Sequence, residues 1–350
     1  MPFSPGDPAP WFSGAPISNP EFTIDTVAGR YVLLAFLPPG EPAAAGAALQ
    51  ALAAHQPMFD DARLSAFVVI RDRPLAASLR DMRGLRWILD FEGAVSRLYG
   101  ALGPDGVEAP SWLVLDPALR VLAQAPLEQA GRVFRFLATL PAPGEHAGVP
   151  LHAPVLIAPR IFEPELCAAL VARHGAEAGR YTGVMRDQGG RTVHVMDELK
   201  KRRDVLVPEP ELQAAIRERL ERRLFPLIAG ALGFTVTQIE RYLVSCYDAE
   251  DGAVFHAHRD NTTQGTAHRK FACSINLNDG FEGGDLRFAE FGPTTYRPPV
   301  GGAVVFSCGL LHEVTRVRAG RRYAFLPFFY DEAGAQVLES YRRRVANLAG

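Results

Sequence analysis

Metal-binding side chains alternate in one short segment of the chain. Residues 247–261 read YDAEDGAVFHAHRDN and place His256, His258 and Asp260 at every second position. On an extended strand these three side chains point to one face. Two imidazoles and one carboxylate form the facial triad of non-haem iron(II) centres, which leaves the opposite coordination positions open. We therefore expect His258 and Asp260 to bind iron, with His312 brought in from a distant strand as the third ligand.

A guanidinium group follows the distal histidine at a defined spacing. Arg322 lies ten residues beyond His312 (322 − 312), at the start of the predicted strand RRYAFLPFFY. An arginine fork suits the distal carboxylate of a dicarboxylate cosubstrate. Neighbours on a strand point to opposite faces, so only one of Arg321 and Arg322 can face the pocket. The Gly-x-Arg spacing from Gly320 selects Arg322, and we expect Arg321 to be solvated.

Three further motifs allow competing interpretations. His256 could replace His258 as a ligand, because His-x-His is also a cupin-style metal pair, or it could line the pocket wall. Residues 312–316, HEVTR, begin like the zinc-protease motif H-E-x-x-H, but Arg316 occupies the second histidine position and that motif requires a helix. We reject that interpretation. The run KKRR at 200–203 could steer an acidic or nucleic-acid partner, but we expect a solvated loop on the substrate side.

The elements that position these residues form a β-rich region from about 235 to 332. Short apolar runs separated by glycine-containing turns predict a barrel or jelly roll; they read YLVSCY, FACSINL, DLRF, AVVFS and YAFLPFFY. Before this region, the pattern predicts a helix over 164–174 and a longer one with apolar residues at four-residue steps from 212 to 224. Pro226 should kink or end the longer helix.

The first part of the chain has a different pattern. Predicted strands at 31–37, 65–70 and 111–116 alternate with predicted helices at 43–55 and 94–102, which is typical of an α/β sheet. The proline- and glycine-rich segment LPAPGEHAGVPLHAP, residues 140–154, indicates a boundary near residue 150. We expect two domains, residues 1–145 and 150–350.

Composition limits the class of protein. The chain has 350 residues, 48% of them hydrophobic, and a formal net charge of −2, so no global field favours nucleic acid or membrane. The start MPFSPGDPAPWF lacks a basic segment followed by an apolar run, and we expect a cytoplasmic protein without a membrane span. The four cysteines lie singly, which fits reduced core thiols.

Residues 155–332 resemble the prolyl 4-hydroxylase-like family of 2-oxoglutarate/Fe(II) oxygenases. The motifs that carry the resemblance are, in order, CY at 246, FHAHRDN at 255, INLND at 275, EGGDLRF at 282, PPVGGAVVF at 298 and HEVTRVRAGRRYA at 312. The resemblance implies an α+β domain built on a double-stranded β-helix, or jelly roll. It also implies Fe(II), 2-oxoglutarate and O2 as cofactor and cosubstrates, with ascorbate as a further cofactor.

The same resemblance assigns roles to individual residues. It implies that His258, Asp260 and His312 bind iron, that Arg322 pairs with the 5-carboxylate of 2-oxoglutarate, and that Tyr247 lines the cosubstrate pocket. Asn276 stands where the family often has tyrosine or threonine, and we assign it to the cosubstrate pocket as well. A further departure places Arg316 where the family often has proline; the metal triad follows the family pattern.

Residues 5–140 resemble the peroxiredoxin branch of the thioredoxin fold. The resemblance is carried by GDPAPWF, YVLLAFLPP, WILDFEGAVSRLYGAL and PSWLVLD, and it implies a cis peptide before Pro110. Peroxide reduction in that family needs a cysteine thiolate after the first core strand, where this chain reads LPPGEPAAAG. Residues 1–166 contain no cysteine. We therefore expect a non-catalytic thioredoxin-like domain that presents substrate, forms a homodimer or shields the oxygenase.

The expected reaction is hydroxylation of a C–H bond with release of succinate and CO2. The resemblance favours a peptidyl side chain such as proline, in a protein or peptide substrate. A free amino acid or other small metabolite is the alternative substrate. A protein that binds a partner and responds to oxygen or 2-oxoglutarate is the alternative function. Thiol redox chemistry through Cys246 or Cys308 is a further alternative, although neither cysteine has a resolving partner nearby in the sequence.

Overall fold

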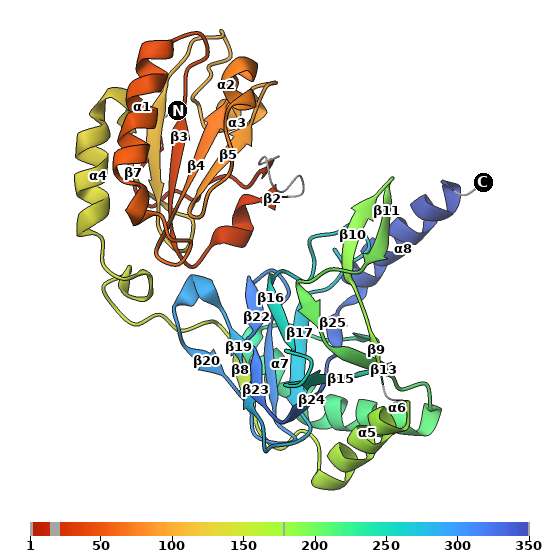
Figure 1. Cartoon of the computed structure of the whole chain (residues 1–350). Helices are drawn as coiled ribbons and strands as arrows, with labels where there is room; N and C mark the ends of the chain where they lie inside the picture. Colours follow the sequence, from red (N-terminus) through yellow and green to blue (C-terminus); the bar gives the residue numbers. More distant parts are fainter. Residues whose placement is uncertain (1–2, 15–21, 178, 349–350) are drawn as a thin grey trace. The chain divides into compact units, whose positions relative to one another are not determined.

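The computed structural model describes residues 3–14, 22–177 and 179–348, and its chain divides into two compact units (Figure 1). The N-terminal unit comprises residues 1–152 and 289–293, and the C-terminal unit comprises residues 153–288 and 294–350. The main chain passes from one unit to the other between His152 and Ala153, inside the predicted linker.

The N-terminal unit is built on a mixed five-stranded sheet in the order β5-β4-β3-β6-β7. The three strands β3, β4 and β5 are parallel, whereas β6 and β7 are antiparallel to their neighbours. The strands are β3 (Tyr31–Phe36), β4 (Leu64–Ile70), β5 (Leu85–Leu89), β6 (Ser111–Leu115) and β7 (Val121–Pro126), and a separate pair is β1 (Ser13–Gly14) with β2 (Phe22–Thr23). The helices are α1 (Pro42–Ala54), α2 (Arg73–Ala77), α3 (Ala94–Leu98) and α4 (Ala130–Thr139).

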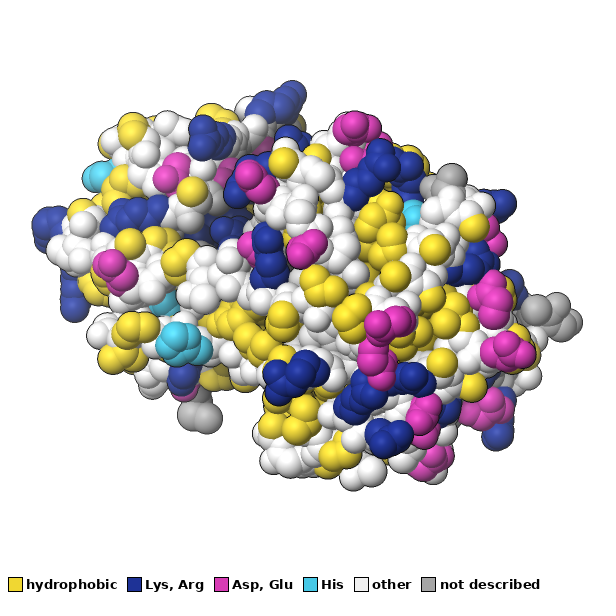
Figure 2. Space-filling model, turned by 90° about the horizontal axis from the view of Figure 1, so that it is seen from below, with side chains coloured by type: hydrophobic (Ala, Val, Ile, Leu, Met, Phe, Trp, Pro, Cys, Tyr) yellow, Lys and Arg dark blue, Asp and Glu magenta, His cyan; other side chains and the backbone are white. Residues whose placement is uncertain are grey.

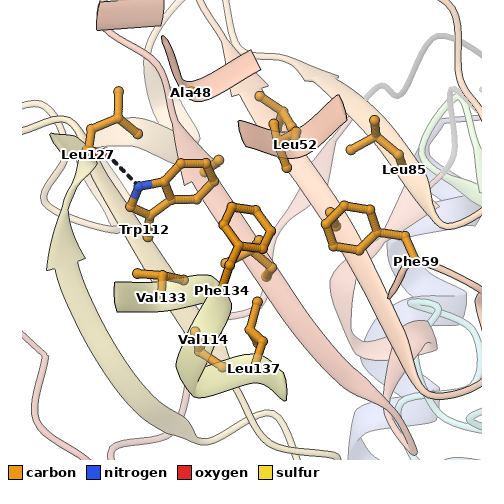
Figure 3. Close-up of a cluster of buried hydrophobic side chains, with 14 of the residues drawn as sticks. Ala48, Leu52, Phe59, Leu85, Trp112, Val114, Leu127, Val133, Phe134 and Leu137 are labelled. Carbon is orange, nitrogen blue, oxygen red and sulfur yellow. Dashed lines mark hydrogen bonds between the residues drawn. The ribbon is translucent and has the colours of Figure 1, made fainter. Parts of the chain in front are cut away.

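The core of this unit lies where α1 and α4 cover the sheet (Figure 3). Trp112 is fully buried on β6 and packs against Phe134 of α4 with ring centroids 5.7 Å apart. Its indole Nε1 donates a hydrogen bond to the backbone oxygen of Leu127 at 2.8 Å, so the polar edge of the ring is satisfied inside the core.

One expectation for this unit is wrong: none of the peptide bonds in the described residues is cis, including the one before Pro110. Pro110 lies immediately before β6 and its backbone oxygen accepts a hydrogen bond from Leu127. The chain therefore enters the strand through an extended trans peptide, the form favoured for most X–Pro bonds.

The C-terminal unit contains two larger antiparallel sheets, the double-sheet arrangement that jelly rolls use. One has the order β14-β25-β17-β24-β15-β13-β9, with β21 on β17 and β8 on β21, and the other has the order β12-β16-β22-β19-β20. Two further antiparallel pairs are the hairpin of β10 with β11 and the long-range pair of β18 with β23.

Their bounds are β8 (Leu156–Ala158), β9 (Arg180–Tyr181), β10 (Val184–Gln188), β11 (Arg191–Val195), β12 (Lys200–Lys201), β13 (Arg203–Leu206), β14 (Gln238–Glu240), β15 (Leu243–Asp248), β16 (Val254–His258), β17 (Phe271–Asn276), β18 (Glu282–Gly283), β19 (Leu286–Arg287), β20 (Thr295–Tyr296), β21 (Ala303–Ser307), β22 (His312–Val314), β23 (Val317–Ala319), β24 (Arg321–Phe325) and β25 (Phe328–Tyr330).

The first of these sheets, which we call the major sheet, has one apolar and one polar face. Val244, Ile275 and Phe325 belong to the hydrophobic core that includes the helices. The residues that alternate with them, among them Tyr247 and Arg322, point to the opposite face, because side chains in a strand alternate between faces. The apolar face is covered by α5 (Pro164–Glu177), α6 (Pro210–Arg219) and α7 (Phe225–Leu232).

Pro226 does not end the predicted long helix, because the helical run continues from Pro210 to Leu232. A π-helical turn, Leu220–Leu224, joins α6 to α7, and Pro226 lies in the first turn of α7. A proline has no N–H to donate to the helix. The π turn changes the hydrogen-bond spacing just before Pro226, so the helix continues past the proline. Ile216, Leu220 and Leu224 are buried on one stripe, as the spacing predicted, whereas Leu212 is only partly buried; Ile228 continues the stripe beyond the predicted range. The last helix, α8 (Glu332–Asn347), was not predicted.

The surface carries both charge signs. On the face drawn in Figure 2, Lys and Arg side chains alternate with Asp and Glu side chains and with apolar ones. No helix in the described part of the chain has the length and apolar character needed to span a bilayer.

Candidate metal and cosubstrate site

Three of the predicted metal ligands come together in the C-terminal unit. His258 ends β16, His312 begins β22, and the two residues are direct partners in the antiparallel ladder. Asp260 follows β16, with its carboxylate oxygens 3.5 Å from His258 Nε2 and 3.3 Å from His312 Nε2. One ligand atom of each residue lies within 4.8 Å of the others, a geometry that one metal ion can fill.

The three alternating positions do not share one face, so that expectation is wrong. The register of β16 against β22 shifts between Phe255 and His258. This bulge breaks the two-residue alternation, and it places the Phe255 ring against the His258 ring with centroids 3.6 Å apart. His256 is exposed and lies outside the group of three ligands.

Backbone contacts orient both imidazoles toward the carboxylate. The Nδ1 atoms of His258 and His312 lie 2.8 and 3.0 Å from the backbone oxygens of His256 and Leu310. A carbonyl oxygen can only accept, so each Nδ1 donates to it, and Nε2 is the ring nitrogen left to face a metal. Burial alone would raise the pKa of Asp260, but His312 and His258 outweigh it and hold that pKa well below its usual range.

The loop that carries Asp260 is held on its backbone. The Asp260 N–H donates to Cys308 O at 2.9 Å, and Asp260 O accepts from Arg269 Nη1 at 3.2 Å. Arg269 in turn donates to both carboxylate oxygens of Glu240, at 2.8 and 2.5 Å, and His268 Nε2 lies 2.7 Å from the same carboxylate. This ion-pair network fixes the position from which the Asp260 carboxylate extends.

Arg322 and Asn276 lie on the polar face of the major sheet. Arg322 is 2% exposed; its Nε donates to Asn276 Oδ1 at 3.1 Å and its Nη2 to Ser274 Oγ at 2.8 Å. Its Nη1 is buried without a hydrogen-bond partner. Gly284 leaves room for this arginine, because a Cβ there would lie 3.0 Å from Arg322 Cδ. The Asn276 amide also donates to Pro298 O, which fixes its orientation. Asn276 thereby holds Arg322 in place through the bond that its Oδ1 accepts.

Arg321 lies on the opposite face of the same strand, as the alternation predicts. Its side chain is 55% exposed and its Nε donates to Asp248 Oδ2 at 2.7 Å. It is therefore partly solvated and paired with an acid rather than directed at the site.

Tyr247 faces Arg322 from the neighbouring strand. The two residues are direct partners in the β15–β24 ladder, and the Arg322 guanidinium carbon lies 5.4 Å from the centroid of the phenol ring. Tyr247 is 1% exposed, and its hydroxyl accepts a hydrogen bond from Arg202 Nη1 at 2.9 Å.

The charge run at 200–203 is not a solvated loop, and this expectation is wrong. Lys200 and Arg202 are buried, whereas Lys201 and Arg203 are partly exposed. The segment pairs as β12 and β13 with strands of both sheets, so its side chains alternate between inside and outside. Asp204, 7% exposed, neutralises part of the buried charge. The alternation K-x-R-x-D before the apolar VLV could have indicated this strand.

The four cysteines are buried and unpaired, as predicted. Burial raises the pKa of Cys167 to about 11 and also raises the pKa values of Cys246, Cys273 and Cys308. Such thiols are poor nucleophiles.

The donor set fits an iron(II) ion and a dicarboxylate. Two imidazole nitrogens and one carboxylate match the ligands of a facial triad. The unpartnered Nη1 of Arg322 supplies a buried donor for a carboxylate, which would satisfy it.

Comparisons with known proteins agree with this chemistry. Residues 242–330 match the family model described as the 2OG-Fe(II) oxygenase superfamily. A PKHD-type hydroxylase of Synechococcus sp. strain CC9605 is 30% identical over 129 residues, which cover 36% of this chain and 57% of that protein.

Two solved structures are also similar. A prolyl-4-hydroxylase of Pseudomonas putida is 19% identical, with a TM-score of 0.39, over 51% of this chain and 92% of that chain. A prolyl hydroxylase of Trichoplax adhaerens, solved with a hypoxia inducible factor peptide fragment, is 16% identical, with a TM-score of 0.41, over 59% of this chain and 94% of that chain. All six candidate residues, from Tyr247 to Arg322, fall inside the segment that matches the 2OG-Fe(II) oxygenase superfamily.

Proposed function

We propose that the C-terminal unit is a 2-oxoglutarate- and Fe(II)-dependent dioxygenase that hydroxylates a C–H bond and releases succinate and CO2. The observation that carries the proposal is the meeting of His258, Asp260 and His312 with their ligand atoms within 4.8 Å. The match of residues 242–330 to the oxygenase superfamily supports the same assignment.

The residues of the chain have separate tasks in this proposal. His258, Asp260 and His312 would hold iron(II), which supplies the oxygen-activating chemistry when bound. Arg322 would bind the distal carboxylate of 2-oxoglutarate, and Tyr247 would line the same pocket. Burial of Tyr247 and Arg322 excludes water from this end of the pocket, which strengthens a charge-assisted hydrogen bond there.

The substrate that we propose is a peptidyl side chain such as proline, on the strength of the motif resemblance. A free amino acid or other small metabolite is the alternative, because fold and cofactor site do not fix a substrate. We further propose that the N-terminal unit is a thioredoxin-like domain without thiol chemistry. Its five-stranded mixed sheet and the lack of cysteine in residues 1–166 support this assignment.

The test is anaerobic reconstitution with Fe(II) and 2-oxoglutarate, followed by addition of oxygen and quantification of succinate. We expect the full chain to form succinate and Asp260→Ala to form none above background. A chain that binds neither iron nor 2-oxoglutarate contradicts the proposal. Binding of both with no succinate across a peptide array and a panel of amino acids favours the alternative, an oxygen- or 2-oxoglutarate-responsive binding protein.

A further inference from the structure

A buried arginine outside the predicted site reaches it through Tyr247. Arg202 lies immediately before β13 and is 5% exposed. Its Nη1 donates to Tyr247 Oη at 2.9 Å, and its Nε donates to Asp204 Oδ2 at 3.3 Å and lies 3.0 Å from Oδ1 of the same ion pair. Its guanidinium carbon also lies 5.4 Å from the ring centroid of Phe255, the residue whose ring stacks on His258. Arg202 therefore lies between the cosubstrate pocket and the metal ligands.

The bond to Arg202 fixes the direction of the phenol proton. An arginine guanidinium has five N–H donors and no acceptor, so the oxygen of Tyr247 must accept from Arg202. The phenol O–H is then left to donate elsewhere, and the bond from Arg202 is the one hydrogen bond that the described residues make with this hydroxyl. Across the ladder, Arg322 Nη1 is a second buried donor without a partner. Two unused donors on one sheet face match one carboxylate.

We propose that Arg202 is a positioning residue for the cosubstrate: it holds Tyr247 so that the phenol O–H, together with Arg322 Nη1, donates to one carboxylate of 2-oxoglutarate. The inference rests on the proposed function. It assigns a role in binding to a residue of the N-terminal part of the C-terminal unit, outside the segment that matches the oxygenase superfamily.

A purely structural ion pair with Asp204 is the competing explanation, and the contacts of Asp204 argue against it. That carboxylate also accepts hydrogen bonds from Lys200, Ser245 and Thr182. Asp204 therefore keeps a cation and two hydroxyl donors when Arg202 is removed. Tyr247 Oη, by contrast, has no other described donor, so loss of Arg202 frees the phenol to rotate its proton.

The experiment is a double-mutant cycle read out by cosubstrate binding. The dissociation constant of 2-oxoglutarate is measured by calorimetry on the full chain loaded with Mn(II), which lacks turnover. The variants are Arg202→Met, Tyr247→Phe and the double variant, with Arg203→Met as the matched control, since Arg203 is a partly exposed neighbour paired with Asp251. We expect each single variant to weaken binding about tenfold, as loss of one charge-assisted hydrogen bond predicts, and the control to bind like the wild type.

The double variant decides between the mechanisms. If Arg202 acts through the phenol, the double variant binds as weakly as Tyr247→Phe alone. Losses that multiply to about one hundredfold would mean that Arg202 contacts the carboxylate itself, and an unchanged Arg202→Met would mean that it has no part in binding; either result overturns the inference. A wild type that binds no 2-oxoglutarate contradicts the proposed function instead.

Folding is checked separately. The thermal midpoint of each variant shows whether a weaker affinity reflects a damaged fold. Should Arg202→Met unfold, Arg202→Lys keeps a cation beside Asp204 but is one bond shorter than the arm that reaches Tyr247. We expect Arg202→Lys to bind 2-oxoglutarate as weakly as Tyr247→Phe, and binding equal to the wild type would overturn the inference.

Discussion

His258 and His312 are direct cross-strand partners on β16 and β22, and their ring centroids lie 4.3 Å apart. With the Nδ1 atom of each ring beside a backbone oxygen, both Nε2 atoms face Asp260. We expect His258→Ala and His312→Ala each to lower the affinity for Fe(II) or Mn(II) by about 100-fold or more, measured by calorimetry. His256→Ala is the matched control because its side chain is exposed. Loss of metal binding in His256→Ala would show that His256 is a ligand and would contradict the assignment to His258 and His312.

Replacement of Arg322 should affect 2-oxoglutarate and leave the metal in place. Arg322→Met removes a buried donor for a carboxylate, so we expect the affinity for 2-oxoglutarate to fall by about 10- to 150-fold, with unchanged Mn(II) affinity. Arg321→Met is the control, since that side chain pairs with Asp248 on the other face. Equal effects of the two substitutions on 2-oxoglutarate would contradict the assignment of Arg322.

Glu240 should make the C-terminal unit sensitive to acid. Burial alone would raise its pKa, but hydrogen bonds from His268 and Arg269 and the charges of Arg269 and Arg241 lower the pKa to about 2. Since this pKa lies below that of the unfolded chain, the stabilisation is present above about pH 4.5 and is lost as the pH falls toward 2.

The stabilisation at neutral pH is about 3 kcal/mol, because the pKa falls from 4.5 to about 2 and each pKa unit corresponds to about 1.4 kcal/mol. Glu240→Gln should lower the unfolding free energy at pH 7 by an amount of this order and flatten its decrease below pH 4.5, as measured by urea unfolding at a series of pH values. Glu339→Gln, which alters an exposed helix pair with Arg343, should leave the profile unchanged. An acid transition that is the same in wild type and Glu240→Gln would show that other groups control it.

The thiols should be inert in the folded protein. All four cysteines are buried, and burial raises their pKa values. We expect a thiol reagent such as DTNB to react slowly at pH 8 with the native chain and to titrate four thiols in denaturant. Rapid native reaction of Cys246 or Cys308 would reopen the alternative of thiol chemistry.

The candidate metal and cosubstrate residues could be singled out in the sequence because their signals lie in short motifs with fixed spacing. His258, Asp260, His312 and Arg322 came from such motifs, and the described contacts bring the first three within reach of one ion. The exposed position of His256 could not be predicted, because a bulge depends on the partner strand and leaves no mark in the local sequence.

Arg202 was missed for a different reason. Charged runs are usually solvated; the alternation K-x-R-x-D before VLV could have indicated a strand, but its burial between strands of both sheets is a tertiary effect. Helix α8, by contrast, has a local signal in the sequence, because Asp331 is a residue type that favours the N-cap position. In the structure its side chain accepts a hydrogen bond from Gly334 N at the start of the helix. The π turn before Pro226 had no such signal, since periodicity alone does not distinguish it from an α-helix.

The two-faced pattern of the major sheet has a consequence for length changes. In β15, Val244 packs in the core beneath the helices, and Tyr247 faces the site from the other side. A point substitution can therefore alter one role and spare the other. Deletion or insertion of a single residue within the strand would exchange the two faces, burying polar groups among the helices and emptying the pocket of its donors. Natural variation in this strand should consequently consist of replacements, with gains and losses of residues confined to the turns.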